Sequence, residues 1–171
     1  MIKFINLSKE KPYNIFKNKY DQALAAEQKN IEAICISSYS IEKKEIDSRF
    51  VNLKFLNDKE LIFFSNYRSP KSKDFHLHDQ VSAVIFWNSI NVQIRIKSKI
   101  TKTSKNFNKK YFEKRDSKKN ALAISSRQSC IVDSYDDVKE KFNKVLRESN
   151  LQECPDYWGG YSLRPYYFEF W

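Results

Sequence analysis

The sequence predicts a mainly β protein, an antiparallel barrel with helices at its periphery. Six or more short segments have the alternation, or the β-branched and aromatic content, that is typical of strands. Helical patterns lie near the start and in the later part of the chain and do not alternate with the strands. A parallel dinucleotide-binding sheet needs that alternation, so an antiparallel barrel is expected instead.

The first half of the chain is expected to contain one helix and then strands joined by tight turns. Pro12 favours the first turn of a helix over residues 13–28, where apolar side chains recur at helical spacing. Residues 57–60 form a four-residue hairpin connection, and Ser69 caps a short helix. The strands are expected over residues 34–39, 49–56, 61–65 and 81–87, and the short helix over residues 71–78.

The second half begins with a long strand that has two different faces. Over residues 91–103, apolar side chains from Val92 to Ile100 point one way, and Gln93 lies among basic residues on the other, wet or functional face. In the earlier strand, Val51, Leu53 and Phe55 share one side by the same alternation. The remaining elements are expected to be helices over residues 106–114, about 120–126 and 136–149, and a strand over residues 162–171.

Composition excludes several classes of protein. A chain of 171 residues with 15% aromatic residues is neither disordered nor too short for a core. No apolar run reaches about 18 residues, so no membrane span is expected, and the first residues have no secretory pattern. The cysteines at positions 35, 130 and 154 show no CxxC spacing. We therefore expect a reducing, cytoplasmic setting without disulfides.

Glycine content and charge narrow the kind of ligand. The only two glycines are adjacent, Gly159 and Gly160, so a Walker loop and a GxGxxG fingerprint are both excluded. The net charge of +10 allows an anionic partner, although the excess lysine can also be a solvated surface alone. No metal site is predicted, because His76 and His78 lack further ligands at suitable spacing. The glycine pair, between Trp158 and Tyr161, indicates either a positive φ or close backbone approach, or a simple turn.

Eight short segments occur in an order and spacing that resemble the pyridoxamine 5'-phosphate oxidase family of FMN-binding split-barrel proteins. The resemblance runs from about residue 30 to the end, which divides the chain into an N-terminal helical extension (1–30) and an FMN-binding split-barrel domain (31–171). The matching segments are Arg49-Phe-Val-Asn-Leu-Lys54, Ile62-Phe-Phe-Ser-Asn66, Ser69-Pro-Lys71, Gln93-Ile-Arg95, Tyr111-Phe-Glu-Lys-Arg115, Ser126-Arg-Gln-Ser129, Trp158-Gly-Gly-Tyr161 and Glu169-Phe-Trp171.

The resemblance implies FMN as cofactor and a homodimer with its cofactor sites between the subunits. Arg49 and Lys71 would hold the FMN phosphate, so cationic side chains replace a glycine loop. The cofactor-binding residues implied by the family are Arg49, Phe50, Val51, Asn52, Phe64, Ser65, Ser69, Lys71, Gln93, Gln128, Ser129 and Trp171. By strict alternation Arg49 and Lys54 lie on opposite faces, so a bulge or strong twist is required for both to reach one site.

The resemblance also implies a phosphorylated small-molecule substrate held by Lys54, Tyr111 and Arg115. The activity would be that of an FMN-dependent oxidoreductase in pyridoxine biosynthesis, which oxidises pyridoxamine or pyridoxine 5'-phosphate to pyridoxal 5'-phosphate with oxygen as acceptor. No residue stands out as a general base, so the catalytic residues are left unassigned. One alternative is an FMN-binding reductase or flavin-binding protein of the same fold with another substrate. A nucleic-acid-binding barrel is an alternative from a different class.

Several positions depart from the family pattern. Phe64 stands where a tyrosine is usual, Pro70 and Val92 where arginines are usual, and Lys119 where a substrate-binding serine is expected. The sequence ends at Trp171, and the family's usual Arg-Leu-His-Asp-Arg-like segment, with further substrate and FMN contacts, follows that tryptophan. These departures indicate either a shortened or divergent oxidase or a relative that acts on something else.

Overall fold

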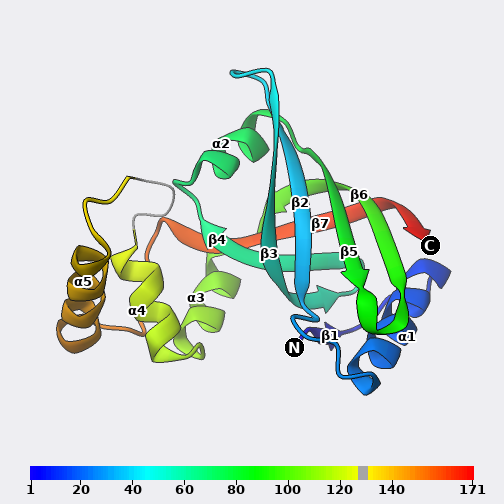
Figure 1. Cartoon of the computed structure of the whole chain (residues 1–171), viewed down its shortest axis with the longest axis horizontal. Coiled ribbons are helices and arrows are strands. Elements are labelled where there is room, and N and C mark those ends of the chain that lie inside the picture. Colours follow the sequence, from blue (N-terminus) through cyan, green and yellow to red (C-terminus); the bar gives the residue numbers. More distant parts are fainter. Residues whose placement is uncertain (127–130) are drawn as a thin grey trace.

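The protein is a closed antiparallel β-barrel with helices on two sides, as the computed structural model shows for residues 1–126 and 131–171 (Figure 1). Six strands pair antiparallel in the order β3-β2-β5-β6-β7-β4, and pairing between β3 and β4 closes the barrel. The predicted barrel is therefore confirmed. The strands are β1 (Lys3–Ile5), β2 (Ala33–Ser40), β3 (Glu45–Asn57), β4 (Glu60–Asn66), β5 (Gln80–Trp87), β6 (Val92–Lys102) and β7 (Trp158–Phe170).

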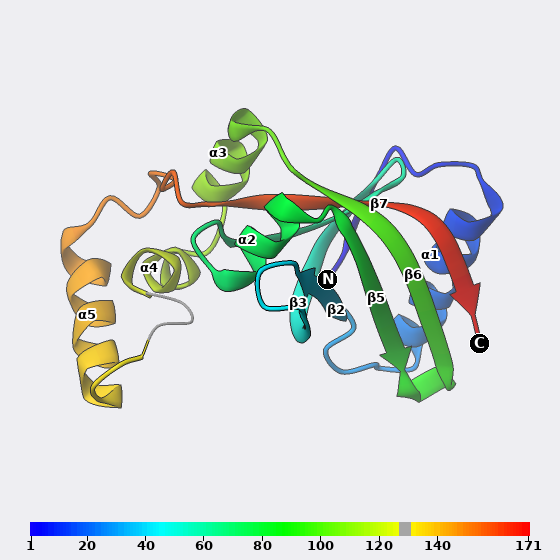
Figure 2. The ribbon, with the colours of Figure 1, turned by 90° about the horizontal axis from the view of Figure 1, so that it is seen from above.

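The helices lie outside the barrel, and α2 lies apart from the others, against β2 (Figure 1). Figures 1 and 2 both place α1 on one side and the α3, α4 and α5 helices on the opposite side. No described helix is long and apolar enough to cross a bilayer. The helices are α1 (Lys11–Ala25), α2 (Pro70–Leu77), α3 (Lys105–Glu113), α4 (Ser117–Ser125) and α5 (Tyr135–Glu148), with a 3₁₀ turn over Asn88–Ile90.

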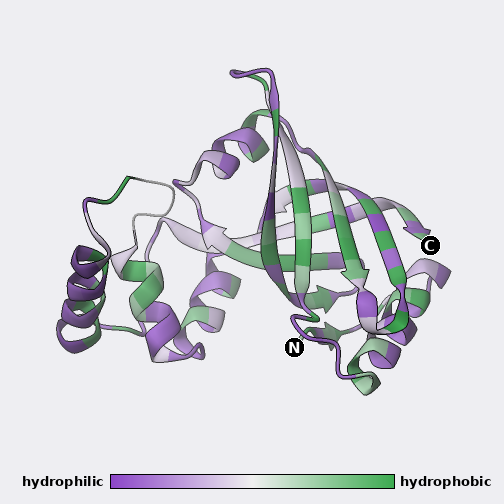
Figure 3. Ribbon diagram, viewed as in Figure 1, coloured by the Kyte–Doolittle hydropathy of each residue, from purple (hydrophilic) through white to green (hydrophobic). Residues whose placement is uncertain are grey.

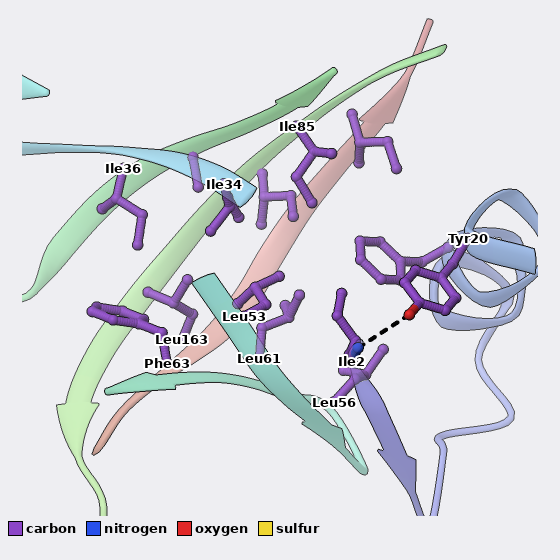
Figure 4. Close-up of a cluster of buried hydrophobic side chains, with 14 of the residues drawn as sticks. Ile2, Tyr20, Ile34, Ile36, Leu53, Leu56, Leu61, Phe63, Ile85 and Leu163 are labelled. Carbon is purple, nitrogen blue, oxygen red and sulfur yellow. Dashed lines mark hydrogen bonds between the residues drawn. The ribbon is translucent and has the colours of Figure 1, made fainter. Parts of the chain in front are cut away.

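The core fills the barrel and continues under α1. Leu53, Leu61 and Leu163 are completely buried where β3, β4 and β7 meet (Figure 4). Helix α1 closes one end, because Phe16 packs edge-on against Trp87 at 5.5 Å between ring centres. The alternation that predicted the strands is visible as green bands along them, whereas α5 is largely hydrophilic (Figure 3).

The N-terminal residues take part in the barrel structure. Strand β1, which the sequence did not predict, pairs in parallel with β3 through Lys3–Ile5. The backbone N–H of Ile2 donates to the hydroxyl of Tyr20, which ties β1 to α1 (Figure 4). The division into an extension and a barrel stays a prediction, but both parts share this core.

Two predicted details of the strands are corrected. The hairpin between β3 and β4 is tighter than expected, since only Asp58 and Lys59 lie outside the strands. Asp58 adopts a φ of 49°, a conformation that aspartate tolerates better than most residues. The last strand begins at Trp158 rather than at residue 162, so the glycine pair lies inside β7.

Candidate functional site

A pocket of about 270 Å³ opens between β3, β4, the start of α2 and the end of α3. Every residue lining it belongs to the set that the sequence predicted for cofactor or substrate. Both cationic and aromatic side chains line it, a combination suited to a flat ligand that carries negative charge. The lining residues are Arg49, Phe50, Val51, Asn52, Lys54, Phe64, Ser65, Lys71, Tyr111 and Arg115.

An irregularity in β3 brings Arg49 and Lys54 to this one pocket. The register of β3 against β4 shifts between Leu53 and Phe55, so the alternation of faces is broken at Lys54. The required bulge is therefore present. The same shift corrects the predicted face of Phe55, which packs against Phe64 and other rings beside the pocket and not with Leu53 in the barrel core.

One end of the pocket carries two neighbouring cations. The Arg49 guanidinium donates to the hydroxyl of Ser38 at 2.7 Å and lies 3.5 Å from Asp47, whose side chain is mostly exposed. The Lys71 ammonium donates to the hydroxyl of Ser69 at 3.1 Å. Burial and the nearby charge of Arg49 lower the pKa of Lys71 below its ordinary value. This end therefore favours an anion.

The position of Lys71 follows from the start of α2. Pro70 occupies the first turn of the helix, and the buried Ser69 hydroxyl donates to the backbone carbonyl of Asn66 at 2.8 Å. Ser69 lies behind Lys71 as a support and does not line the pocket. Ser65, by contrast, lines the pocket from β4.

Nearly parallel aromatic rings form the wall at the other end. Phe64 contacts Tyr111 with ring centres 4.1 Å apart, and it contacts Trp158 at 4.9 Å. The Arg115 guanidinium lies 5.1 Å from the centre of the Trp158 ring, within cation–π range. Burial raises the pKa of Tyr111, so its phenol stays protonated and can donate to an anion.

Two polar partners at this end were not predicted from the sequence. Asn120, 1% exposed, accepts from Arg115 at 3.2 Å and donates to the carbonyls of Phe112 and Leu151. Glu32 forms an ion pair with Lys54. An asparagine in a helix and an acid before a strand are common, so neither gave a signal that periodicity could detect.

The adjacent glycines allow close packing beneath the aromatic wall. A side chain on Gly159 would place its Cβ 2.1 Å from the Tyr67 hydroxyl, and one on Gly160 would meet Thr103 at 2.5 Å. Neither glycine has a positive φ. Of the two alternatives, close backbone approach inside a strand is therefore correct, and a turn is not.

Two predicted cofactor residues, Gln93 and Trp171, lie away from this pocket. Gln93 and Trp171 exchange two backbone hydrogen bonds at the start of β6. In the strand order, β2 and β5 lie between β6 and the pocket strand β3. Trp171 is 82% exposed. Gln128 and Ser129 lie outside the residues that the structure describes.

Known proteins resemble this chain in sequence and in structure, although no family model matches it. Pyridoxine/pyridoxamine 5'-phosphate oxidase 1 of Hydrogenovibrio crunogenus is 33% identical over 162 residues, which cover 94% of this chain and 74% of the relative. The oxidase of Leptospira biflexa serovar Patoc is also 33% identical, with 94% and 76% covered.

Two solved structures share the fold. PhzG from Burkholderia lata, in complex with tetrahydrophenazine-1-carboxylic acid, superposes with a TM-score of 0.87 at 21% identity, covering 94% of this chain and 79% of that one. A pyridoxamine 5'-phosphate oxidase-related, FMN-binding protein from Nostoc punctiforme has a TM-score of 0.75 at 11% identity, with 91% and 83% covered. With its barrel, its pocket and these relatives, this chain belongs to the pyridoxine/pyridoxamine 5'-phosphate oxidase family and has the fold of the FMN-binding split barrels.

Proposed function

We propose that this protein is an FMN-dependent oxidoreductase that converts pyridoxamine or pyridoxine 5'-phosphate to pyridoxal 5'-phosphate with oxygen as acceptor. The observation that carries the proposal is a single pocket with two cationic ends, Arg49 with Lys71 at one and Lys54 with Arg115 at the other. Two phosphate groups, one from cofactor and one from substrate, match these ends. Family membership supports the same reaction.

The residues at the first end fit the phosphate of FMN. Lys71 is half-buried, its ammonium contacts the neutral hydroxyl of Ser69, and its pKa is depressed by burial and by Arg49. A phosphate beside both cations would offset the burial of the Lys71 charge and its repulsion by Arg49, and it would accept charge-assisted hydrogen bonds. FMN, when bound, would accept a hydride from the substrate and pass electrons to oxygen.

The residues at the second end would orient the substrate. Tyr111 in the last turn of α3 and Arg115 just beyond the end of that helix present a phenol and a guanidinium to the pocket that Lys54 also lines. Their contribution is positioning: a phosphate fixed by three donors leaves the substrate ring few orientations. We assign no general base.

We further propose that the working form is a homodimer. Gln93 and Trp171 lie on β6 and beyond β7, with two strands separating β6 from the pocket strand β3, so one chain does not bring them to the same ligand. The pocket volume of about 270 Å³ is also small for a cofactor and substrate together. A second copy would supply the missing wall, and the exposed rings of Phe50 and Trp171 are available for that contact.

The activity is tested with purified protein loaded with FMN and given pyridoxamine 5'-phosphate in air. Formation of pyridoxal 5'-phosphate and peroxide is expected, with loss of turnover in Lys54→Met and retention in Lys73→Met, an exposed lysine on α2. No product at full FMN occupancy would refute the proposed reaction.

The dimer is tested by complementation between two inactive variants. Lys71→Met and Gln93→Ala are assayed at an FMN concentration too low to fill a site weakened about tenfold or more, so each should be nearly inactive alone. In a mixture, half of the dimers would carry one intact site, so about a quarter of wild-type activity should return. No recovery, or a monomer in sedimentation, would refute a shared site.

A second candidate is an oxidoreductase of the same family with a different ring substrate. The observation in its favour is the pairing of Lys54 with Glu32, which leaves this end of the pocket less positive. PhzG, of the same fold, binds a ring carboxylate. Faster oxidation of a reduced ring carboxylate than of pyridoxamine 5'-phosphate would favour this candidate.

A further inference from the structure

The charge of Lys54 is already matched by a carboxylate of the same chain. The Lys54 ammonium lies 2.5 Å from Oε1 of Glu32, and the two side chains are 26% and 20% exposed. Partly buried pairs of this kind are screened less by water and salt than exposed ones. A ligand that reaches Lys54 therefore meets an ion pair and not a free cation.

The backbone fixes this pairing. Glu32 precedes β2, and its carbonyl accepts from the backbone N–H of Leu53 at 2.8 Å, so Glu32 lies across the ladder from the residue before Lys54. Glu32 also contacts the amino group of Met1, a largely exposed residue, through its other oxygen. Burial raises the pKa of Glu32, but hydrogen bonds from Lys54 and from that amino group lower it further, so the carboxylate is charged at neutral pH.

The charges at this end of the pocket now decide what it binds. Lys54 and Arg115 bring two positive charges. Within the described residues, the Arg115 guanidinium donates to two neutral acceptors, the Lys119 carbonyl and Asn120, and the Asp116 carboxylate lies near it. Glu32 offsets the charge of Lys54, and its side chain is not among the residues that line the pocket. In the part of the chain that the structure describes, Glu32 is the one hydrogen-bond partner of the Lys54 ammonium, which can still donate to a ligand. With this offset, the preference of the site for a phosphate dianion over a group with a single negative charge is smaller than two unpaired cations would give.

We propose that Glu32 is a specificity-determining residue, which neutralises Lys54 and lowers the preference of the pocket for phosphorylated over unphosphorylated ring ligands. This inference rests on the proposed function in one respect, namely that the ligand lies against Lys54, Tyr111 and Arg115. The consequence is a site that releases a phosphorylated product more readily and accepts less charged rings.

The test uses two ligands that do not react, 4-deoxypyridoxine 5'-phosphate and 4-deoxypyridoxine, with the FMN-loaded full chain and calorimetric titration. The measured quantity is the ratio of their dissociation constants. Glu32→Gln, which keeps the shape of the side chain, should raise the preference for the phosphorylated ligand by about tenfold, a typical effect of one partly screened charge. Glu10→Gln is the matched control, because Glu10 pairs with Lys59 outside the pocket.

A purely structural role for Glu32 would change both dissociation constants together and leave their ratio unchanged. The effect should be smaller when Lys54 is Met, because the part of it that depends on pairing with that lysine is then lost. An unchanged or smaller ratio in Glu32→Gln, or an equal rise in the Lys54→Met background, would overturn the inference. A raised ratio without turnover of pyridoxamine 5'-phosphate would reject only the proposed reaction, and turnover with an unchanged ratio would reject only the role of Glu32.

Discussion

Replacement of Lys71 by Met should have opposite effects on ligand affinity and on stability. The ammonium is half-buried near Arg49 and has a lowered pKa, so its positive charge destabilises the folded chain when no ligand is bound. Loss of a charge-assisted hydrogen bond to a phosphate costs about 1.5–3 kcal/mol, or about a 10- to 150-fold weaker affinity for FMN. Methionine keeps the length of the side chain and removes the buried charge.

The free protein should become more stable at the same time. A gain of about 1 kcal/mol in the free energy of unfolding is expected, because the substitution removes a buried charge that destabilises the folded chain. For a chain of this size that gain raises Tm by about 2–4 °C. The lowered pKa means that the charged form is disfavoured on folding at neutral pH. The gain should therefore shrink as pH rises through that lowered pKa and the wild-type lysine loses its proton.

The assays are quenching of FMN fluorescence for affinity and thermal unfolding without FMN at neutral and alkaline pH for stability. Lys73→Met is the control, because Lys73 lies on the same helix and is exposed. Equal FMN affinity in Lys71→Met and wild type would refute the assignment of this end to phosphate. A lower Tm at neutral pH would refute the electrostatic argument.

Three further predictions concern the opposite wall of the pocket. Gly159→Ala should lower the free energy of unfolding by about 1–3 kcal/mol in urea titration, since its Cβ would meet the hydroxyl of Tyr67 at 2.1 Å; an unchanged midpoint would contradict the close approach. Asn120→Ala should destabilise by about 1–3 kcal/mol, because buried carbonyls lose their donor, and should weaken substrate binding as Arg115 loses a partner. Tyr111→Phe should raise KM about fivefold, the loss of one hydrogen bond of about 1 kcal/mol, with kcat and FMN affinity unchanged; a fall in kcat alone would contradict a positioning role.

Periodicity and turn residues were sufficient to predict the barrel strands, because each strand has one face in a closed core. Strand β1 escaped prediction because three residues carry too little alternation and its pairing with β3 is parallel. The start of β7 at Trp158 was not predicted, because adjacent glycines in a sequence usually indicate a turn. Only the structure shows the neighbouring atoms that leave no room for a side chain at these two positions.

The lining of the pocket came from motif resemblance, and its geometry required the structure. Arg49 and Lys54 violate strict alternation, and only the register shift explains how both reach the pocket. The roles of Glu32 and Asn120 could not be predicted from the sequence, because they depend on partners distant along the chain. Gln93 and Trp171 lie on another part of the barrel, a separation that the sequence motifs did not reveal.

The parallel rings of Tyr111, Phe64 and Trp158 connect the ligand wall to the last strand of the barrel. Phe64 touches both other rings, and Arg115 lies over Trp158. A change of ring size at position 64 would therefore shift the Tyr111 phenol and the Arg115 guanidinium together. Substitutions that adapt this wall to a new ligand should therefore arise in compensating pairs, and single exchanges should harm recognition before they alter it.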